Sequence, residues 1–316
     1  MRIVVTGGAG FIGSALVGGL LQQHPGARIL VLDDLSTGTE DNLDEVRGAT
    51  EFARADIRNY EAIQDLFRGA DLVFHLAAVP SVPRSINEPE LAHQVNINGT
   101  FNVLLAAQRA RVRRLVYAAS SSAYGDTPTL PKIESMPPQP KSPYAVQKLV
   151  GEYYARVFTE VYSLETVALR FFNVFGPRQD PGSPYSGVIS VFLDALIHRR
   201  PPAIFGDGEQ SRDFTYVENI VHLCLNAAQA PQAAGRMYNG GTGARVTLNQ
   251  AWQMLQRIEG VEIPPLYAPP RPGDVRHSQA DISAASRDLG YQPTVDFEEG
   301  LRRTLAWYKE RPGGNI

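Results

Sequence analysis

The stretch "VVTGGAGFIGSALVGGLL", residues 4–21, decides the fold, because it places three glycines between an apolar strand and an apolar helix. Gly7, Gly10 and Gly13 give the chain a tight turn, a close backbone approach and close packing of the helix on the strand. The free N–H groups at the start of such a helix face a pyrophosphate. The spacing is GxxGxxG, not GxGxxG, so the triplet indicates a dinucleotide site only together with its surroundings.

Two carboxylates close the strand that follows this helix. Asp33 comes 20 residues after Gly13, where a carboxylate can accept hydrogen bonds from the adenosine ribose hydroxyls. A 2′-phosphate would meet like charge from Asp33 and Asp34, so the pattern favours NAD over NADP. Asp56 with Ile57 stands at another strand end and suits the adenine amine, although a helix N-cap is the alternative for Asp56. The remaining strand-end candidates are Leu76, Ala77 and Ala78.

Short apolar runs alternate with helix-like segments through the first half of the chain. The expected strands are "RIVVTG", "ARILVLDD", "ADLVFHLAA", "RRLVYAAS" and "LETVALRFFN". Most are too apolar for a sheet with one wet face, which indicates a parallel sheet. Helices are expected near residues 11–23, 60–68, 88–111 and 143–162. The alternation predicts an α/β fold with a Rossmann-type doubly wound parallel sheet, which binds ligands at the carboxyl ends of its strands.

The alternation of strands and helices gives way after about residue 175 to Pro- and Gly-rich loops around shorter helices. Such composition indicates a smaller α/β substrate-binding domain built largely of loops. We therefore expect an NAD-binding domain over residues 1–175 and a substrate domain over residues 176–316, with segments near 213–250 returning to the first. The segments "RMYNGG" and "VTLNQAWQMLQRI" are the candidates for that return.

Composition excludes several classes of protein. The 316 residues carry a net charge of -3 and 43% apolar residues, so a substantial core is expected and nucleic acid and anionic membranes are not expected as partners. One cysteine, Cys224, cannot form an internal disulfide. The six histidines show no ligand spacing, so no metal site is expected. No leader sequence and no run of 18 apolar residues is seen, which predicts a soluble, cytoplasmic protein.

The stretch "KSPYAVQK", residues 141–148, places two chemically useful side chains on one helix face. Ser142 can cap the helix and Pro143 suits its first turn, so Tyr144 and Lys148 fall at positions i and i+4. A phenol with a pKa near 10 is a poor base at neutral pH, but a nearby ammonium and a nicotinamide cation both favour the phenolate. The alternative for an isolated YxxxK is an ordinary surface pair.

A serine-rich strand end strengthens the catalytic interpretation. In "YAASSSAYG", residues 117–125, Ser120 lies 24 residues before Tyr144. Its hydroxyl can share the proton of a substrate oxygen with the tyrosine. Each of these motifs is weak evidence by itself. The serines, the tyrosine helix and the glycine turn together indicate a catalytic site beside a dinucleotide.

With these motifs the sequence resembles the extended short-chain dehydrogenase/reductase superfamily, and within it the nucleotide-sugar epimerases and dehydratases, most closely the UDP-hexose 4-epimerases. Further motifs occur in the family's order: "LDDLSTG", "FHLAA", "SSSAYGD", "SPYAVQK", "LRFFNVFGPRQ", "GDGEQSRDF" and "RPGDVRHSQAD". The resemblance implies that Tyr144 is the base, that Lys148 holds it and the nicotinamide ribose, and that Ser120 is the hydroxyl partner. The implied reaction is inversion at C4 of a UDP-hexose through a transient 4-keto sugar.

The resemblance also implies the rest of the site. It adds to the NAD site Phe11, Ile12, Ser36, Thr37, Gly38, Asn96 and Phe171. It gives as substrate-binding residues Ser81, Arg84, Ser120, Ser122, Tyr144, Asn173, Val188, Arg212, Arg271, Asp274 and Ser278, with the loop around Tyr185 bordering the sugar. The planar forks of the two arginines in the second domain suit a diphosphate, and Asp274 suits a ribose hydroxyl.

Two positions discriminate within the family. Dehydratases and decarboxylases carry an acid two places before the tyrosine of the "YG" pair, where this chain has Ser122. A hydroxyl cannot replace a carboxylic acid in expelling water, which favours simple epimerisation. Ser278 stands where the resemblance puts a wall of the sugar pocket, and its small size leaves volume for an N-acetyl group. We therefore expect N-acetylated and plain UDP-hexoses to be substrates.

Three alternatives keep the fold and the cofactor: a dTDP-glucose 4,6-dehydratase, a UDP-glucuronate decarboxylase and a UDP-glucuronate 4-epimerase. A fourth is an NAD-sensing module without turnover, which need not keep Ser120, Tyr144 and Lys148 together. Helices 88–111 and 143–162 carry apolar stripes beyond what one sheet face needs, and family members pair through these helices. A homodimer is therefore expected.

Overall fold

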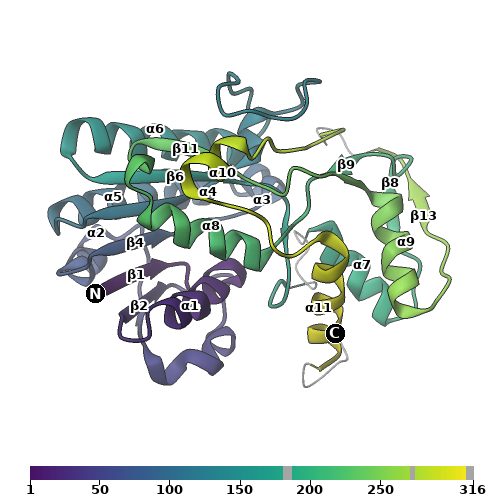
Figure 1. Cartoon of the computed structure of the whole chain (residues 1–316), viewed down its shortest axis with the longest axis horizontal. Helices are drawn as coiled ribbons and strands as arrows, with labels where there is room; N and C mark the ends of the chain where they lie inside the picture. The colour runs from purple at the N-terminus through teal and green to yellow at the C-terminus, as the bar shows by residue number, and fades with distance from the viewer. Residues whose placement is uncertain (181–186, 271–274, 311–316) are drawn as a thin grey trace.

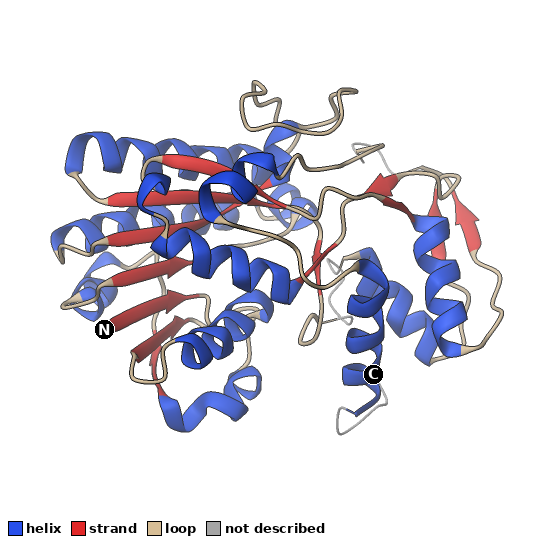
Figure 2. Cartoon of the chain, in the orientation of Figure 1, coloured by secondary structure: helices blue, strands red, loops and turns tan. Residues whose placement is uncertain are grey.

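Seven parallel strands form the central sheet of the protein, whose computed structural model describes residues 1–180, 187–270 and 275–310. The order is β11-β6-β5-β4-β1-β2-β3, and every neighbouring pair runs parallel (Figure 1, Figure 2). The strands are β1 (Arg2–Thr6), β2 (Arg28–Asp33), β3 (Thr50–Arg54), β4 (Leu72–His75), β5 (Arg114–Ser120), β6 (Glu165–Phe171) and β11 (Arg236–Gly240). The strand order reverses between β1 and β4, which makes their carboxyl ends the place where a ligand binds.

Helices cover both faces of this sheet, because its central strands are buried on both sides; all seven residues of β5 are buried. One face is covered by α1 (Phe11–Gln23), α8 (Val217–Gln229) and α10 (Ser283–Leu289). The other face is covered by α2 (Tyr60–Ile63), α5 (Thr100–Arg109) and α6 (Pro143–Tyr162). This is the doubly wound α/β fold that the sequence predicts.

The predicted helices are confirmed to different degrees. Residues 11–23 and 143–162 form α1 and α6 with the expected limits, and the Ser142 hydroxyl accepts from the Ala145 N–H at 3.2 Å as the cap of α6. The segment 60–68 is shorter, since α2 passes into a 3₁₀ turn at Gln64–Phe67. The segment 88–111 is divided into α4 (Pro89–His93), a π-helical turn (Gln94–Gly99) and α5. A further helix, α3 (Val82–Asn87), was not predicted.

A second core lies beside the carboxyl ends of the strands, on the right of Figure 1. Phe192 of α7 (Val188–Ile197) packs edge-on against Trp252 of α9 (Leu248–Glu259), and α11 (Phe297–Glu310) adds Leu301 and Leu305. Short strands pair around this core: β7 (Val174–Phe175) with β10 (Thr215–Tyr216), β8 (Ala203–Phe205) with β13 (Leu266–Ala268), and β9 (Ser211–Arg212) with β12 (Val246–Thr247).

The two segments expected to return to the first domain behave differently. "RMYNGG" forms β11 at the edge of the large sheet, as predicted. "VTLNQAWQMLQRI" forms β12 and α9, whose apolar face packs into the second core, so this part of the expectation was wrong. We propose to keep the division between residues 1–175 and 176–316, with α8, β11 and α10 returning to the first domain.

In the three described ranges, no helix combines the length and the apolar character that crossing a membrane requires. The same ranges bring together no group of three or more His, Cys, Asp or Glu side chains that could hold a metal ion.

Candidate active site

A cavity of about 1350 Å³ opens at the carboxyl ends of the strands, between the sheet and the second core. A pocket for one small ligand typically measures about 300–1,000 Å³, so this cavity has room for two ligands. Every described residue predicted to bind cofactor or substrate lines it, except Gly38 and Asn96. Arg271, Asp274 and Tyr185 lie outside the described residues.

The glycine turn forms one wall of the cavity. Gly7 has φ 71°, and a Cβ there would lie 2.6 Å from the Ala77 backbone N. A Cβ on Gly13 would lie 2.0 Å from the Gly7 carbonyl oxygen. The N-cap residue of α1 is Gly10, which has no side chain to cap the helix, so the first N–H groups of α1 face the cavity unblocked. Such a helix start binds an anion.

Asp33 fixes this turn as well as facing the cavity. Its carboxylate accepts from the Ala9 N–H at 3.0 Å and from the Leu35 N–H at 2.9 Å. Burial raises the pKa of Asp33, and these two backbone hydrogen bonds oppose the rise. A carboxylate has about four acceptor positions, so two remain for ribose hydroxyls.

Gly38 and Asn96 stand behind the wall of the cavity. A Cβ on Gly38 would lie 2.7 Å from the Ala9 carbonyl carbon, so this glycine lets its loop pack on the glycine turn. The buried Asn96 amide accepts from the Val79 N–H at 2.8 Å and donates to the Val79 carbonyl and, at 2.8 Å, to Gln147 Oε1. Its polar atoms are thus used within the protein, and we propose that both residues position the cofactor walls without contacting the cofactor.

Asp56 and Ile57 line the far end of the same cavity. The Asp56 carboxylate pairs with the Arg58 guanidinium at 2.6 Å, and this hydrogen-bonded partner lowers the pKa of Asp56. Asp56 is not a helix cap, because the cap of α2 is Asn59, whose side chain accepts from the Ala62 N–H at 3.2 Å. The N-cap alternative for Asp56 was wrong.

The three residues predicted for catalysis lie together in the cavity. Tyr144, in the first turn of α6, lines the cavity beside Ser120 at the end of β5. The Ser120 Oγ accepts from the Ser122 Oγ at 2.8 Å and the Ser122 N–H at 3.2 Å, which orients it. Burial raises the pKa of Tyr144, and the Ser120 side chain lowers it only in part. This direction is opposite to the one expected beside an ammonium.

Lys148 lies one turn further along α6 and is almost fully buried. Its Nζ donates to the Ala118 carbonyl at 2.8 Å and lies 5.0 Å from the centre of the Tyr117 ring. Burial lowers the pKa of Lys148 to about 8, and the Glu152 carboxylate opposes this fall. Helix α6 approaches β5 closely because residue 151 is glycine: a Cβ there would lie 2.2 Å from the Tyr117 Oη.

The second half of the cavity carries the residues predicted for substrate. Asn173, which has φ 32°, donates to the Asp213 carbonyl at 3.2 Å and lies two residues beyond the end of β6. Arg212 lies on β9, and Ser278 is held beside it through a backbone bond to Ser211 at 3.0 Å. The other predicted lining residues on this side are Ser81, Arg84, Ser122 and Val188.

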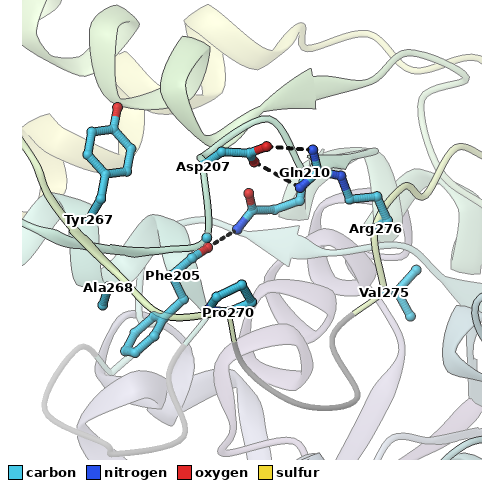
Figure 3. A pocket seen from close by; sticks show the side chains of 9 residues that line it. Phe205, Asp207, Gln210, Tyr267, Ala268, Pro270, Val275 and Arg276 are labelled. Carbon is cyan, nitrogen blue, oxygen red and sulfur yellow. Dashed lines mark hydrogen bonds and ion pairs between the residues drawn. The ribbon is translucent and has the colours of Figure 1, made fainter.

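A smaller hollow of about 680 Å³ adjoins this half (Figure 3). Asp207 and Arg276 form a double hydrogen bond at its rim, both at 2.8 Å. Gln210 donates to the Phe205 carbonyl at 2.6 Å, and both residues line the two cavities. The hollow is therefore an extension of the same site.

Comparison with known proteins places the chain in a family. The profile of the NAD dependent epimerase/dehydratase family matches residues 3–241. This chain belongs to that family. The UDP-glucose 4-epimerase of Mycolicibacterium smegmatis is 38% identical over 315 residues, which cover 98% of this chain and 99% of that protein.

Two solved structures extend the likeness to the whole molecule. The UDP-N-acetylglucosamine 4-epimerase from Methanobrevibacter ruminantium, in complex with UDP-N-acetylmuramic acid, has a TM-score of 0.93 and 38% identity, with 98% of each chain covered. The UDP-glucose 4-epimerase of Thermus thermophilus, in complex with NAD, has a TM-score of 0.89 and 36% identity, with 99% of this chain and 100% of that chain covered.

The residues present fit the family's cofactor, NAD. The uncapped start of α1 suits the pyrophosphate, the glycines leave room that a Cβ would fill, and the free lone pairs of Asp33 suit the ribose. NAD is therefore the cofactor of this epimerase/dehydratase family member.

Sequence reasoning missed several residues that line the cavity. Arg178 lines the cavity, has φ 69° and pairs with Glu45 at 2.9 Å. The buried Lys132 donates to both oxygens of Thr127. The "GPRQ" motif contained a signal for the first, but nothing local distinguishes the second from a surface lysine. The other unpredicted lining residues include Phe205, Gln210 and His277.

Proposed function

We propose that this protein is an NAD-dependent isomerase that inverts C4 of UDP-hexoses, both the N-acetylglucosamine/N-acetylgalactosamine pair and the glucose/galactose pair. The observation that carries the proposal is the convergence of Ser120, Tyr144 and Lys148 on one cavity with the glycine turn. An NAD-sensing module without turnover has no need of this arrangement.

Tyr144 and Ser120 perform the proton transfer. Tyr144 removes the proton from the sugar 4-hydroxyl and later returns it to the oxygen of the transient 4-keto sugar, and the Ser120 hydroxyl beside it can share that proton. Bound NAD supplies a hydride acceptor and, once reduced, a hydride donor, so it is regenerated in each turnover. The protein must therefore let the sugar present both faces while the rest of the substrate stays bound.

Positive charge decides when Tyr144 can act as a base. The groups of the protein alone raise the pKa of Tyr144, because its burial outweighs the effect of the Ser120 side chain. Lys148 brings one buried cation to the same helix face, and oxidised NAD adds a second. Tyr144 thus becomes a base with the cofactor bound, which restrains proton abstraction in its absence.

The second half of the cavity holds the nucleotide. The Arg212 guanidinium and the Asn173 amide suit a diphosphate, and we keep Arg271 and Asp274 as predictions for the same group and its ribose. Ser278 and Ser122 leave the sugar end small and hydroxyl-lined. A pocket that grips UDP more firmly than sugar permits the rotation that inversion requires.

Ser122 separates epimerisation from the dehydratase alternative. Its hydroxyl donates to Ser120 at 2.8 Å, so the position both lacks a carboxylic acid and serves to orient the catalytic serine. Elimination of water needs a proton donor that a serine does not supply. The substrate panel below decides the glucuronate epimerase alternative.

We propose that two copies pair through α5 and α6. Both helices carry apolar side chains that the single chain leaves exposed, which is the pattern of a subunit interface. On α6 these are Val146, Tyr153, Tyr154, Val157, Val161 and Tyr162, and on α5 Phe101. A cytoplasmic location is part of the same proposal.

The test is incubation of the purified protein and NAD with a panel of UDP-hexoses and UDP-glucuronate, followed by NMR of the sugar H4 signal. Inversion of the N-acetylated and plain hexoses is expected. Accumulation of a 4-keto-6-deoxy sugar or a pentose, or inversion of the glucuronate alone, refutes the assignment.

A further inference from the structure

A third charged residue continues the catalytic face of α6. Tyr144, Lys148 and Glu152 occupy positions i, i+4 and i+8, so they lie in one line along the helix. Glu152 is only 7% exposed, deep beneath the cavity. Its carboxylate accepts two hydrogen bonds from Arg170 of β6, at 2.9 and 2.7 Å. Neither residue lines the cavity.

This pair is poorly explained as a stabilising element. Removing two charges from water costs the folded state about as much as their attraction returns, and an apolar pair of equal size is often at least as stable. The Arg170 Nη1 also lacks a hydrogen-bond partner among the described residues, and the guanidinium stacks 4.4 Å from the centre of the Tyr124 ring. The position of the pair under the catalytic helix gives it another use.

Lys148 is surrounded by groups that do little to stabilise the charge of its ammonium. Its Nζ has one hydrogen bond, to the Ala118 carbonyl, and the faces of β4 and β5 contribute the buried side chains His75 and Tyr117. His75 is held between Thr6 and Thr100 and stays neutral, since burial lowers its pKa to about 3.

The titratable and charged groups near Lys148 are therefore few. Tyr144 and Glu152 face it from α6, and Arg170 reaches from β6 to Glu152. Glu152 is the carboxylate that acts on Lys148 within the described chain.

We propose that Glu152, held in place by Arg170, is a positioning residue that keeps the buried Lys148 side chain charged beneath Tyr144. The bidentate contact holds the carboxylate in one orientation, and Glu152 stands one turn from Lys148 on the same face of α6. The direction of the Lys148 pKa agrees, because Glu152 opposes the fall that burial causes. The catalytic consequence of this charge rests on the proposed function; the charge itself does not.

The direct test measures Lys148 without cofactor or substrate. The chain has four lysines, Lys132, Lys141, Lys148 and Lys309, so selective ¹³Cε-lysine labelling gives four NMR signals that single Lys→Arg variants assign. In Glu152→Gln the titration midpoint of Lys148 is expected to fall by about one to two pH units, the effect of a unit charge about 6 Å away at an effective dielectric constant of about 20. The exposed Lys141 serves as internal reference and keeps its midpoint.

A second variant is needed in case Glu152→Gln does not fold, because that substitution leaves the Arg170 charge buried without its partner. Glu152→Gln with Arg170→Met removes both charges and is expected to show the same fall for Lys148. An unchanged Lys148 midpoint in either folded variant overturns the proposal. Glu152→Asp, which keeps the charge, is expected to restore the midpoint at least in part.

The activity readout then separates positioning from stability. If the wild type inverts UDP-hexoses, the alkaline limb of its kcat profile is expected to move to lower pH in Glu152→Gln, in step with the Lys148 midpoint. A uniform loss at every pH, with the limb in place, overturns the catalytic part. A wild type without inversion refutes the proposed function and leaves the NMR result to judge the Lys148 charge.

Discussion

Replacing Lys148 by Met is expected to abolish activity and to stabilise the fold at neutral pH. Burial lowers the pKa of Lys148 from 10.5 to about 8, and each pH unit corresponds to about 1.4 kcal/mol, so the buried charge costs the folded state about 3.5 kcal/mol. Methionine has a similar length and leaves no large void. Loss of the hydrogen bond to the Ala118 carbonyl costs about 1–3 kcal/mol. The net gain at pH 7 is about 1.5 kcal/mol.

The change in unfolding free energy that Lys148→Met causes is expected to reverse its sign as pH rises. Between pH 8 and 10.5 the unfolded chain keeps a proton that folded Lys148 has lost, so wild-type stability rises with pH in this window. The variant lacks that rise. Urea unfolding at pH 7 and pH 10 is therefore expected to turn the gain of Lys148→Met into a deficit, a change of about 2.5 kcal/mol.

Lys141→Met is the matched control for Lys148→Met. Lys141 has its side chain 55% exposed, so the substitution is expected to leave stability nearly unchanged at both pH values. A Lys148→Met protein that is less stable than the wild type by the same amount at both pH values would refute the reasoning, since burial would then impose no penalty on the ammonium.

The remaining predictions use the same protein. Tyr144→Phe is expected to slow inversion by about 10²–10⁴-fold with NAD still bound, whereas Tyr291→Phe, which removes a buried hydroxyl bonded to a carbonyl at 2.8 Å, lowers Tm and keeps the rate. Ser278→Tyr is expected to reduce turnover of N-acetylated sugars more than of plain ones; equal losses contradict its role. Gly13→Ala puts a Cβ 2.0 Å from a carbonyl oxygen, and calorimetry is expected to show lost NAD binding. In the wild type, kcat is expected to fall as pH rises through about 8, where Lys148 loses its proton.

The sequence predicts the parts of the structure that local chemistry determines. The glycine turn and the cap at Ser142 act over a few residues, and the limits of α1 and α6 are confirmed. The fully apolar strands require cover on both faces, and the parallel sheet follows from them. The cavity likewise gathers the strand-end residues, because parallel strands end at the same edge.

Features that depend on distant partners escape such reasoning. Asn96 lies in the π-helical turn, and its amide bonds to Val79 and Gln147, 17 and 51 residues away. Helix α9 is amphipathic, and its pattern of apolar residues does not indicate which of the two cores that apolar face packs into. The sequence alone shows that Glu152 continues the line of Tyr144 and Lys148 along α6. Its partner Arg170 is identified only by the fold.

The close packing of α6 on β5 also limits which substitutions the sequence of α6 can accept. At Gly151 any side chain would meet the Tyr117 hydroxyl, and the helix it would push outward carries Tyr144 and Lys148 at one end and the exposed apolar stripe on its other face. A saturation library selected for turnover should therefore tolerate many replacements along that outer stripe and almost none at residue 151, whereas selection for binding to partner copies should restrict both. Catalysis and pairing would then be separately evolvable, with this one glycine as the shared constraint.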